Sequence, residues 1–248
     1  MKIMLDDKAM PIKTHGGVPK SKLDRIVMFR TVIISSAVST LTACGTPSSQ
    51  GLGPQGLSAL KDKTLVIANT ATPADFRVFT PTKAFLGLVG DAAMVSEGNR
   101  IAAKNAVADP AISIARDLAL QLNNAAATRW SPTSVAIASD SGSAAALSAK
   151  AADANLVLYV RTLDWRTWYY TTNFNRYRAR VEVSAELINT ATQTVIASAT
   201  CDDSSPLSAD VSPTYDEIVG AGAQRLKDEL ARAQLACVAT LKRGLLGG

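Results

Sequence analysis

The chain has 248 residues, of which 47% are hydrophobic and 19% are charged, as expected for a folded globular protein and not for a disordered one. Its formal charge of +5 lies almost wholly in residues 1–43, where seven Lys and Arg residues face three Asp residues, so the charge balance gives no reason to expect a nucleic-acid partner. The single histidine, His15, also lies in this segment, which excludes catalytic triads, histidine general bases and histidine-ligated zinc from the remaining 205 residues.

The first predicted element is an apolar run over residues 31–40, which follows Arg30 and ends at Leu41-Thr42-Ala43-Cys44. A positive charge, about 7–15 apolar residues and small residues before a cleavage point are the parts of a secretory signal. The run is too short for a membrane-spanning helix, which needs about 20 residues. The last four residues resemble the lipobox of bacterial lipoproteins. The alternative is a buried core segment that ends in a chance cysteine.

The resemblance implies that residues 1–43 are a signal peptide that is cleaved before Cys44, with Met28 as an alternative start. It also implies a thioether-linked lipid on the Cys44 sulfur and an acyl chain, such as palmitate, on its new amino group. Gly45 follows where inner-membrane lipoproteins tend to carry Asp, so the resemblance favours the outer membrane, facing the periplasm, with the inner membrane as the alternative. Residues 44–63 are rich in Gly, Ser, Pro and Gln, which predicts a flexible lipidated tether.

Residues 64–248 are expected to form a single domain, and their number is ordinary for one core. Short apolar runs predict buried strands, at 64–68, 135–138 and 156–160. From Arg176 to Leu187 polar and apolar residues alternate, which predicts a strand with one face in the core and one in solvent. Residues 189–193 are the predicted turn, and 195–201 return as the partner strand of a hairpin.

Capping signals predict two longer helices in this domain. Asp109-Pro110 places an N-cap and a first-turn proline before apolar residues at helical spacing. Ser212-Pro213 does the same before a last helix that reaches Leu241. Residues 143–152 predict a short Ala-rich helix. The apolar segment 83–95 has two interpretations, a core helix or a surface segment that touches a membrane or a partner.

The predicted order of elements is strand, helix, strand, helix, strand, strand, helix. It indicates an α/β domain with a small mixed sheet, a C-terminal antiparallel hairpin and helices mainly on one face. Over about residues 65–240 this order resembles the periplasmic α/β domains of the TolB N-terminal half, of the curli secretion lipoprotein and of the lipoprotein activators of penicillin-binding proteins. The hairpin turn over residues 187–196 resembles a turn common in that group, with Asn189 in place of the usual Asp and Gln193 in place of the usual Gly.

The chain also resembles widespread lipoproteins of no known activity, in which a Trp- and Tyr-rich stretch precedes such a hairpin and a cysteine ends it. Neither group supplies catalytic residues that transfer to this sequence. The resemblance therefore implies a fold and a location in the cell envelope, and it assigns no reaction.

Cys201 and Cys237 are the two cysteines that remain beside Cys44. In an exported protein an even pair predicts a disulfide. Cys237 falls on the apolar face of the last predicted helix, and Cys201 shares its strand face with Val195. The two thiols meet if that strand face also looks inward. The alternative is two buried free thiols.

Seven of the thirteen aromatic residues lie between residues 159 and 177, and they flank Arg161, Asp164 and Arg166. Exposed aromatic and arginine side chains are the usual anchors of a protein interface. The predicted contact residues are Arg161, Trp165, Arg166, Trp168, Tyr169, Tyr170 and Phe174. The alternative is that two strands extend through this region and pack their aromatic residues across each other. Both interpretations hold if only one face is buried.

Arg176, Arg178 and Arg180 form a basic stripe on one face of the hairpin, and Glu182 and Glu186 continue it. This pattern favours a solvated surface of mixed charge. The alternative is a surface that binds anionic lipid, peptidoglycan or an acidic partner.

Together these features predict a membrane-anchored periplasmic lipoprotein that acts as a protein-binding or scaffolding module of the cell envelope. The expected partners are the membrane, through the lipid anchor, and an envelope protein. We expect no enzyme activity, no cofactor and no metal. One alternative is a small-ligand sensor or an enzyme that gathers carboxylates such as Asp164, Glu182 or Asp202 in a deep pocket. A further alternative is self-assembly into a homo-oligomer.

Overall fold

The computed structural model describes residues 50–137 and 142–247. Residues 44–248 form one compact unit, separate from residues 1–43. The expected signal peptide and the lipidation site at Cys44 precede residue 50 and lie outside the described residues. Within the described ranges, no helix has both the length and the apolar character that a membrane span requires.

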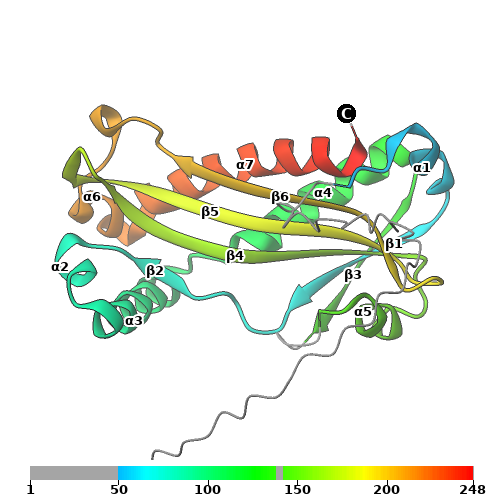
Figure 1. The fold of residues 1–248 in the computed structure, drawn as a ribbon, viewed down its shortest axis with the longest axis horizontal. Coiled ribbons are helices and arrows are strands. Elements are labelled where there is room, and N and C mark those ends of the chain that lie inside the picture. Colours follow the sequence, from blue (N-terminus) through cyan, green and yellow to red (C-terminus); the bar gives the residue numbers. More distant parts are fainter. Residues whose placement is uncertain (1–49, 138–141, 248) are drawn as a thin grey trace, which may run out of the picture. The chain divides into compact units, whose positions relative to one another are not determined.

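A six-stranded mixed sheet forms the centre of the domain (Figure 1). Its strands are β1 (Thr64–Thr70), β2 (Phe76–Val78), β3 (Arg129–Ile137), β4 (Leu156–Tyr170), β5 (Asn173–Asn189) and β6 (Thr194–Ser205). The order across the sheet is β3-β1-β4-β5-β6, and β2 pairs with β4 beyond this path. β1 pairs in parallel with β3 and β4, whereas β5 runs antiparallel to both β4 and β6. The predicted α/β class, mixed sheet and hairpin are confirmed.

The long strand β4 pairs with two short parallel strands at different points along its length. β1 pairs with its first part, from Leu156 to Tyr159, and β2 pairs with a later part, from Trp165 to Thr167. β4 and β5 together run continuously through the aromatic region of the sequence. The expectation that the strands extend through this region is therefore confirmed.

The helices are α1 (Gly53–Ala59), α2 (Pro81–Ala84), α3 (Gly87–Asn105), α4 (Pro110–Ala126), α5 (Ala144–Lys150), α6 (Tyr215–Val219) and α7 (Gln224–Leu246). α4 and α7 cover one face of the sheet and bury the larger apolar cluster with it. α5 packs on the other face, where Leu147 joins a smaller cluster with Tyr159 and Ile188.

Local capping explains where the helices begin. Asp109 is the N-cap of α4, and its side chain accepts a hydrogen bond from the Ala111 N–H, as predicted. The last helix differs from the prediction because it is broken in two. α6 begins after Thr214, which forms a capping box with Glu217, and glycines at 220 and 222 separate it from α7. Gly222 has φ +69°, a left-handed conformation that interrupts an α-helix.

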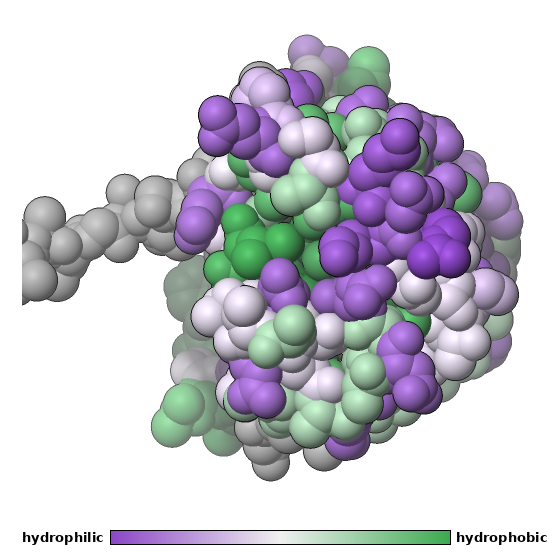
Figure 2. Space-filling view, turned by 90° about the vertical axis from the view of Figure 1, so that its right-hand side faces the viewer, coloured by the Kyte–Doolittle hydropathy of each residue, from purple (hydrophilic) through white to green (hydrophobic). Residues whose placement is uncertain are grey.

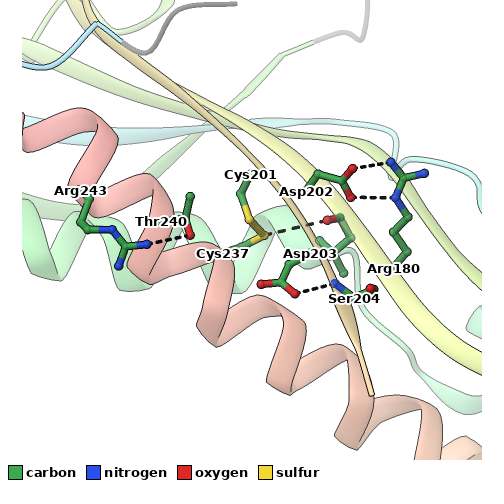
Figure 3. Close-up of a disulfide and its surroundings, with 9 residues drawn as sticks. Arg180, Cys201, Asp202, Asp203, Ser204, Cys237, Thr240 and Arg243 are labelled. Carbon is green, nitrogen blue, oxygen red and sulfur yellow. Dashed lines mark hydrogen bonds and ion pairs between the residues drawn. A yellow bond between two sulfur atoms is a disulfide. The ribbon is translucent and has the colours of Figure 1, made fainter. Parts of the chain in front are cut away.

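A disulfide joins Cys201 on β6 to Cys237 on α7, and both residues are buried (Figure 3). The predicted pairing is confirmed, because the strand face that carries Cys201 looks toward α7. Asp202, the next residue, points to the opposite face and meets Arg180 there. This alternation fixes which face of β6 belongs to the core.

The expected tether over residues 44–63 is wrong for its described part. Gln50 forms two backbone hydrogen bonds with Ser198 on β6, and the Leu52 N–H donates to the carbonyl of Leu245 on α7. Leu52 and Leu57 pack against the core, and Leu60 is buried within it. The packing of these apolar side chains holds the segment on the domain. The Gly- and Pro-rich composition of the segment gave no indication of this packing.

Candidate surface for partner binding

The hairpin of β4 and β5 has one covered and one open face near its tip. α7 and α6 pack against β5 on the covered face, where Val181 and Tyr177 belong to the core. On the other face, α5 packs near the opposite end of the hairpin, beside Tyr159 and Ile188. Among the described residues, no helix packs on this face near the tip, so the outward side chains of 161–180 form an open surface. We call it the open face.

Trp165 lies on the covered side and not on the open face. It is 2% exposed, its ring lies 4.7 Å from that of Phe76, and its Nε1–H donates to the carbonyl of Ala74 at 2.9 Å. The prediction that Trp165 is a partner contact is therefore wrong. The physical reason is a β-bulge at Leu163, where the pairing of β4 with β5 skips one residue.

The bulge changes the side of the sheet on which later residues lie. Arg161 precedes it and is exposed, with its Nε–H donating to Ser184 Oγ at 3.0 Å. After the bulge the even-numbered residues share the side of Arg161. Arg166 and Trp168 therefore lie on the open face, and Trp165 and Tyr169 lie on the other side, where Tyr169 packs against the core.

Charged residues on the open face form two rows across neighbouring strands. Asp164, Glu182 and Asp202 pair directly across β4, β5 and β6. A second row lies two residues further along β4. In it, Arg166 pairs with Arg77 on β2 and with Arg180 on β5. Like charges directly opposite each other are unfavourable, so each row is stabilised by the row beside it.

Ion pairs connect the two rows. Asp164 lies 2.7 Å from Arg166 Nε and 3.7 Å from Arg77, and Arg180 lies 3.5 Å from Glu182. Arg180 also donates from Nε to Asp202 at 2.7 Å. The hydrogen bond from Arg180 lowers the pKa of the Asp202 carboxyl, and the same bond raises the pKa of Arg180. Three acids and three arginines thus neutralise each other, which supports the interpretation of a mixed-charge surface.

Next to the charged rows, aromatic rings and arginines stack on one another. Trp168 stacks on Phe79, with ring centroids 4.5 Å apart. The guanidinium of Arg166 lies 4.7 Å from the Trp168 ring and 5.1 Å from the Phe79 ring. Arg178 lies over the ring of Tyr170 at 5.1 Å. Burial lowers the pKa of Arg166, with Asp164 acting in the opposite direction.

The remaining predicted contacts lie at the tip of the hairpin. Phe174 is 56% exposed and meets Tyr169 edge-on, with centroids 5.4 Å apart. The Tyr170 hydroxyl donates to the Pro206 carbonyl, which fixes that ring on the strand end. Sequence reasoning missed Phe79, because it follows the three-residue strand β2 almost ninety residues earlier in the chain.

An apolar tip lies between α2 and α3, at the same end of the molecule as the hairpin turn (Figure 1). Phe85 is 91% exposed and Leu88 is 90% exposed, with Leu86 and Val89 beside them. The core interpretation of segment 83–95 is wrong for these residues, although Met94 is buried. At the tip, Gly90 allows the start of α3 to approach the Lys83 carbonyl closely, since a Cβ at this position would collide with that oxygen.

The carboxylates of the alternative enzyme hypothesis lie on a sheet face and not in a deep pocket. Asp164, Glu182 and Asp202 are all engaged by arginines in the charged rows. The part of the chain that the structure describes contains no cluster of side chains suited to hold a metal ion. The groups on the open face are aromatic rings, guanidinium groups and paired charges.

No family model and no curated protein matches this sequence. Among solved structures, PelC of Paraburkholderia phytofirmans, a dodecamer, shares 15% identity over 74% of this chain and 89% of its own, with a TM-score of 0.35. The hypothetical protein CT253 of Chlamydia trachomatis shares 10% identity over 75% of this chain and 99% of its own, with a TM-score of 0.36. Lipoprotein GNA1162 of Neisseria meningitidis shares 12% identity over 68% of this chain and 99% of its own, with a TM-score of 0.23. At these values none of them indicates a function for this chain.

Proposed function

We propose that this protein is a lipid-anchored, periplasm-facing envelope protein that binds another envelope protein through the open face, and that it is not an enzyme. The observation that carries the proposal is the stacked group of Trp168, Phe79, Arg166, Tyr170 and Arg178 on a sheet face that no helix of the described chain covers near the hairpin tip.

The composition of the open face favours a protein partner. Aromatic and arginine side chains are enriched at the centres of protein interfaces, where they supply most of the binding energy. Here the rings and guanidinium groups are already stacked, so little side-chain freedom remains to be lost on binding. The three acids and three arginines of the charged rows pair with one another, and Arg161 and Arg178 add positive charge to the same face, which suits a partner with acidic as well as apolar groups.

The position of the open face suits an anchored protein. Gln50, the first described residue, pairs with Ser198 near the start of β6, at the end of the domain that carries α1. The turn between β4 and β5 lies at the other end of the long axis (Figure 1). A lipid on Cys44, as the lipobox resemblance implies, leaves the tip of the hairpin farthest from the anchor and free to meet a partner.

Crosslinking in living cells tests the proposal. A photoreactive amino acid at Phe174, which is exposed at the tip, is expected to give one discrete crosslinked product. Trp168→Ala in the same chain is expected to reduce that product severalfold, because it removes the ring on which Phe79 and Arg166 stack.

The matched control places the photoreactive amino acid at Leu235, which is 67% exposed on α7. It is expected to give no product that depends on Trp168. A product from Phe174 that keeps its yield in Trp168→Ala, or an equal product from Leu235, would show that the open face is not the binding surface.

A further inference from the structure

A cavity of about 440 Å³ lies at the end of the domain opposite the hairpin tip. α1, the start of β4 and the turn between β5 and β6 enclose it. The apolar part of its wall is formed by Leu52, Gly56, Ala59, Leu60, Leu156 and Ile196. Figure 2 looks at this end of the molecule and shows apolar side chains gathered in a hollow among polar ones.

Polar groups line this cavity together with the apolar wall. Lys63, Asn155 and Asn189 contribute to the lining, and Lys63 and Asn155 are exposed residues. A cavity of this volume falls within the range of about 300–1,000 Å³ that holds small ligands. Apolar walls with a few polar groups suit a ligand with a hydrocarbon body and one polar end.

The cavity lies close in sequence to Cys44, the residue that carries acyl chains in the proposed function. Gln50 lines the cavity and is held there by its backbone hydrogen bonds to Ser198, each 2.9 Å long. Cys44 precedes Gln50 by six residues, and six residues span at most about 20 Å. An acyl chain attached at Cys44 is therefore within reach of the cavity.

We propose that the cavity binds an acyl chain, and that its occupant in the anchored protein is one of the chains carried by Cys44. The identity of that occupant rests on the proposed lipid anchor, whereas the binding of acyl chains rests on the cavity alone. The hydrocarbon lies against Leu60, Leu156 and Ile196, and the polar end of the chain lies near Lys63. This acyl chain can then lie either in the cavity or in the bilayer.

A fatty-acid titration tests the binding site on residues 44–248, which form a compact unit, with Cys44→Ser to remove the anchor. The probe is cis-parinaric acid, whose fluorescence rises on binding, and palmitic acid is the competitor. We expect saturable binding that palmitic acid displaces. Ala59→Trp is expected to weaken it by about tenfold or more, because the larger side chain fills the cavity.

Matched substitutions separate a filled cavity from a damaged fold. Ser58→Trp lies next to Ala59 on α1 but outside the cavity lining, and it is expected to bind as the parent does. Ala191→Trp, from the opposite wall, is expected to weaken binding, and Thr192→Trp beside it is expected to have no effect. All four variants are compared at equal folded fraction, measured by thermal unfolding.

Absence of saturable binding overturns the proposal, as does equal affinity of the two cavity-filling variants and their controls. Labelling of the full chain with radioactive palmitate in a bacterium tests the anchor separately, with Cys44→Ala as the unlabelled control. Label without cavity binding overturns the site and keeps the proposed anchor. Cavity binding without label overturns Cys44 as the source of the occupant and the proposed anchor with it.

Discussion

Trp165 and Trp168 are three residues apart on β4 and have different environments. Trp165 is enclosed by Phe76 and the core, whereas Trp168 is half-buried on the open face. Deleting a fully buried large side chain removes its transfer free energy and leaves a cavity. The same deletion at a half-exposed position leaves no closed cavity behind.

We therefore expect Trp165→Ala to lower the free energy of unfolding by about 3–5 kcal/mol, and Trp168→Ala to lower it by about 1–2 kcal/mol, because the stacking on Phe79 and Arg166 is lost. Urea unfolding followed by circular dichroism measures both. Similar losses in the two variants would mean that the bulge at Leu163 does not separate the two rings.

The pair of Arg180 and Asp202 predicts a dependence of stability on pH. The hydrogen bond from Arg180 lowers the pKa of Asp202 in the folded protein. Such a carboxyl stabilises the fold fully above its unfolded-state pKa of about 3.9, and this contribution is lost as the pH falls through the folded-state pKa.

The melting temperature is accordingly expected to fall as the pH is lowered from about 5 through the unfolded-state pKa and on through the lower folded-state pKa, and to fall less in Asp202→Asn. Thermal unfolding across this range measures the difference. Asp153→Asn, at an exposed position before β4, serves as the control and should follow the parent. Parallel curves for the parent and Asp202→Asn would contradict the assigned ion pair.

At the scale of elements, the disulfide and α7 hold the hairpin of β5 and β6 against the core. β6 is the outer strand of the sheet, and α7 packs on it and on β5. The bond between Cys201 and Cys237 closes a segment of 36 residues and ties this edge to the helix. A crosslink of that span reduces the entropy of the unfolded chain.

Cys201→Ala combined with Cys237→Ala is expected to lower the free energy of unfolding by about 3–4 kcal/mol, because the unfolded chain gains freedom. Urea unfolding of the oxidised parent and of the double variant measures it. Reduced parent protein is the control and should behave like the variant. A loss below about 1 kcal/mol would contradict the role given to the crosslink.

At the scale of the whole molecule, the two ends of the long axis have different tasks in the proposed function. The end with α1 is where the described chain begins, at Gln50, and it holds the cavity. The other end carries the open face and the apolar tip at Phe85 and Leu88. The sheet connects them, because β4 and β5 run from one end to the other.

The docking of residues 50–63 predicts that this segment belongs to the fold. A chain that begins at Thr64 loses the packing of Leu52, Leu57 and Leu60 and is expected to be about 2–4 kcal/mol less stable than residues 44–248 with Cys44→Ser. Urea unfolding of the two chains measures the difference. Equal midpoints would show that the segment is a tether, as its composition predicts.

The sequence by itself determined the features that depend on neighbouring residues. Alternation predicted the long strand that contains Val181 and Val183, because successive side chains of a strand point to opposite faces. The N-cap at Asp109 was predictable because capping acts within one helical turn. The disulfide was expected from an even pair of cysteines in an exported chain, whereas only the structure shows that the face of β6 that carries Cys201 looks toward α7.

Only the tertiary structure decided the features that depend on register between distant segments. The bulge at Leu163 moved Trp165 into the core, and no local pattern marks where a strand skips a residue. β2 brought Phe79 to Trp168, and pairing with β6 brought Asp202 to Arg180. Side chains so far apart in sequence become neighbours only when the strands align, which is why the aromatic-rich region could be located from sequence but the residues on its open face could not.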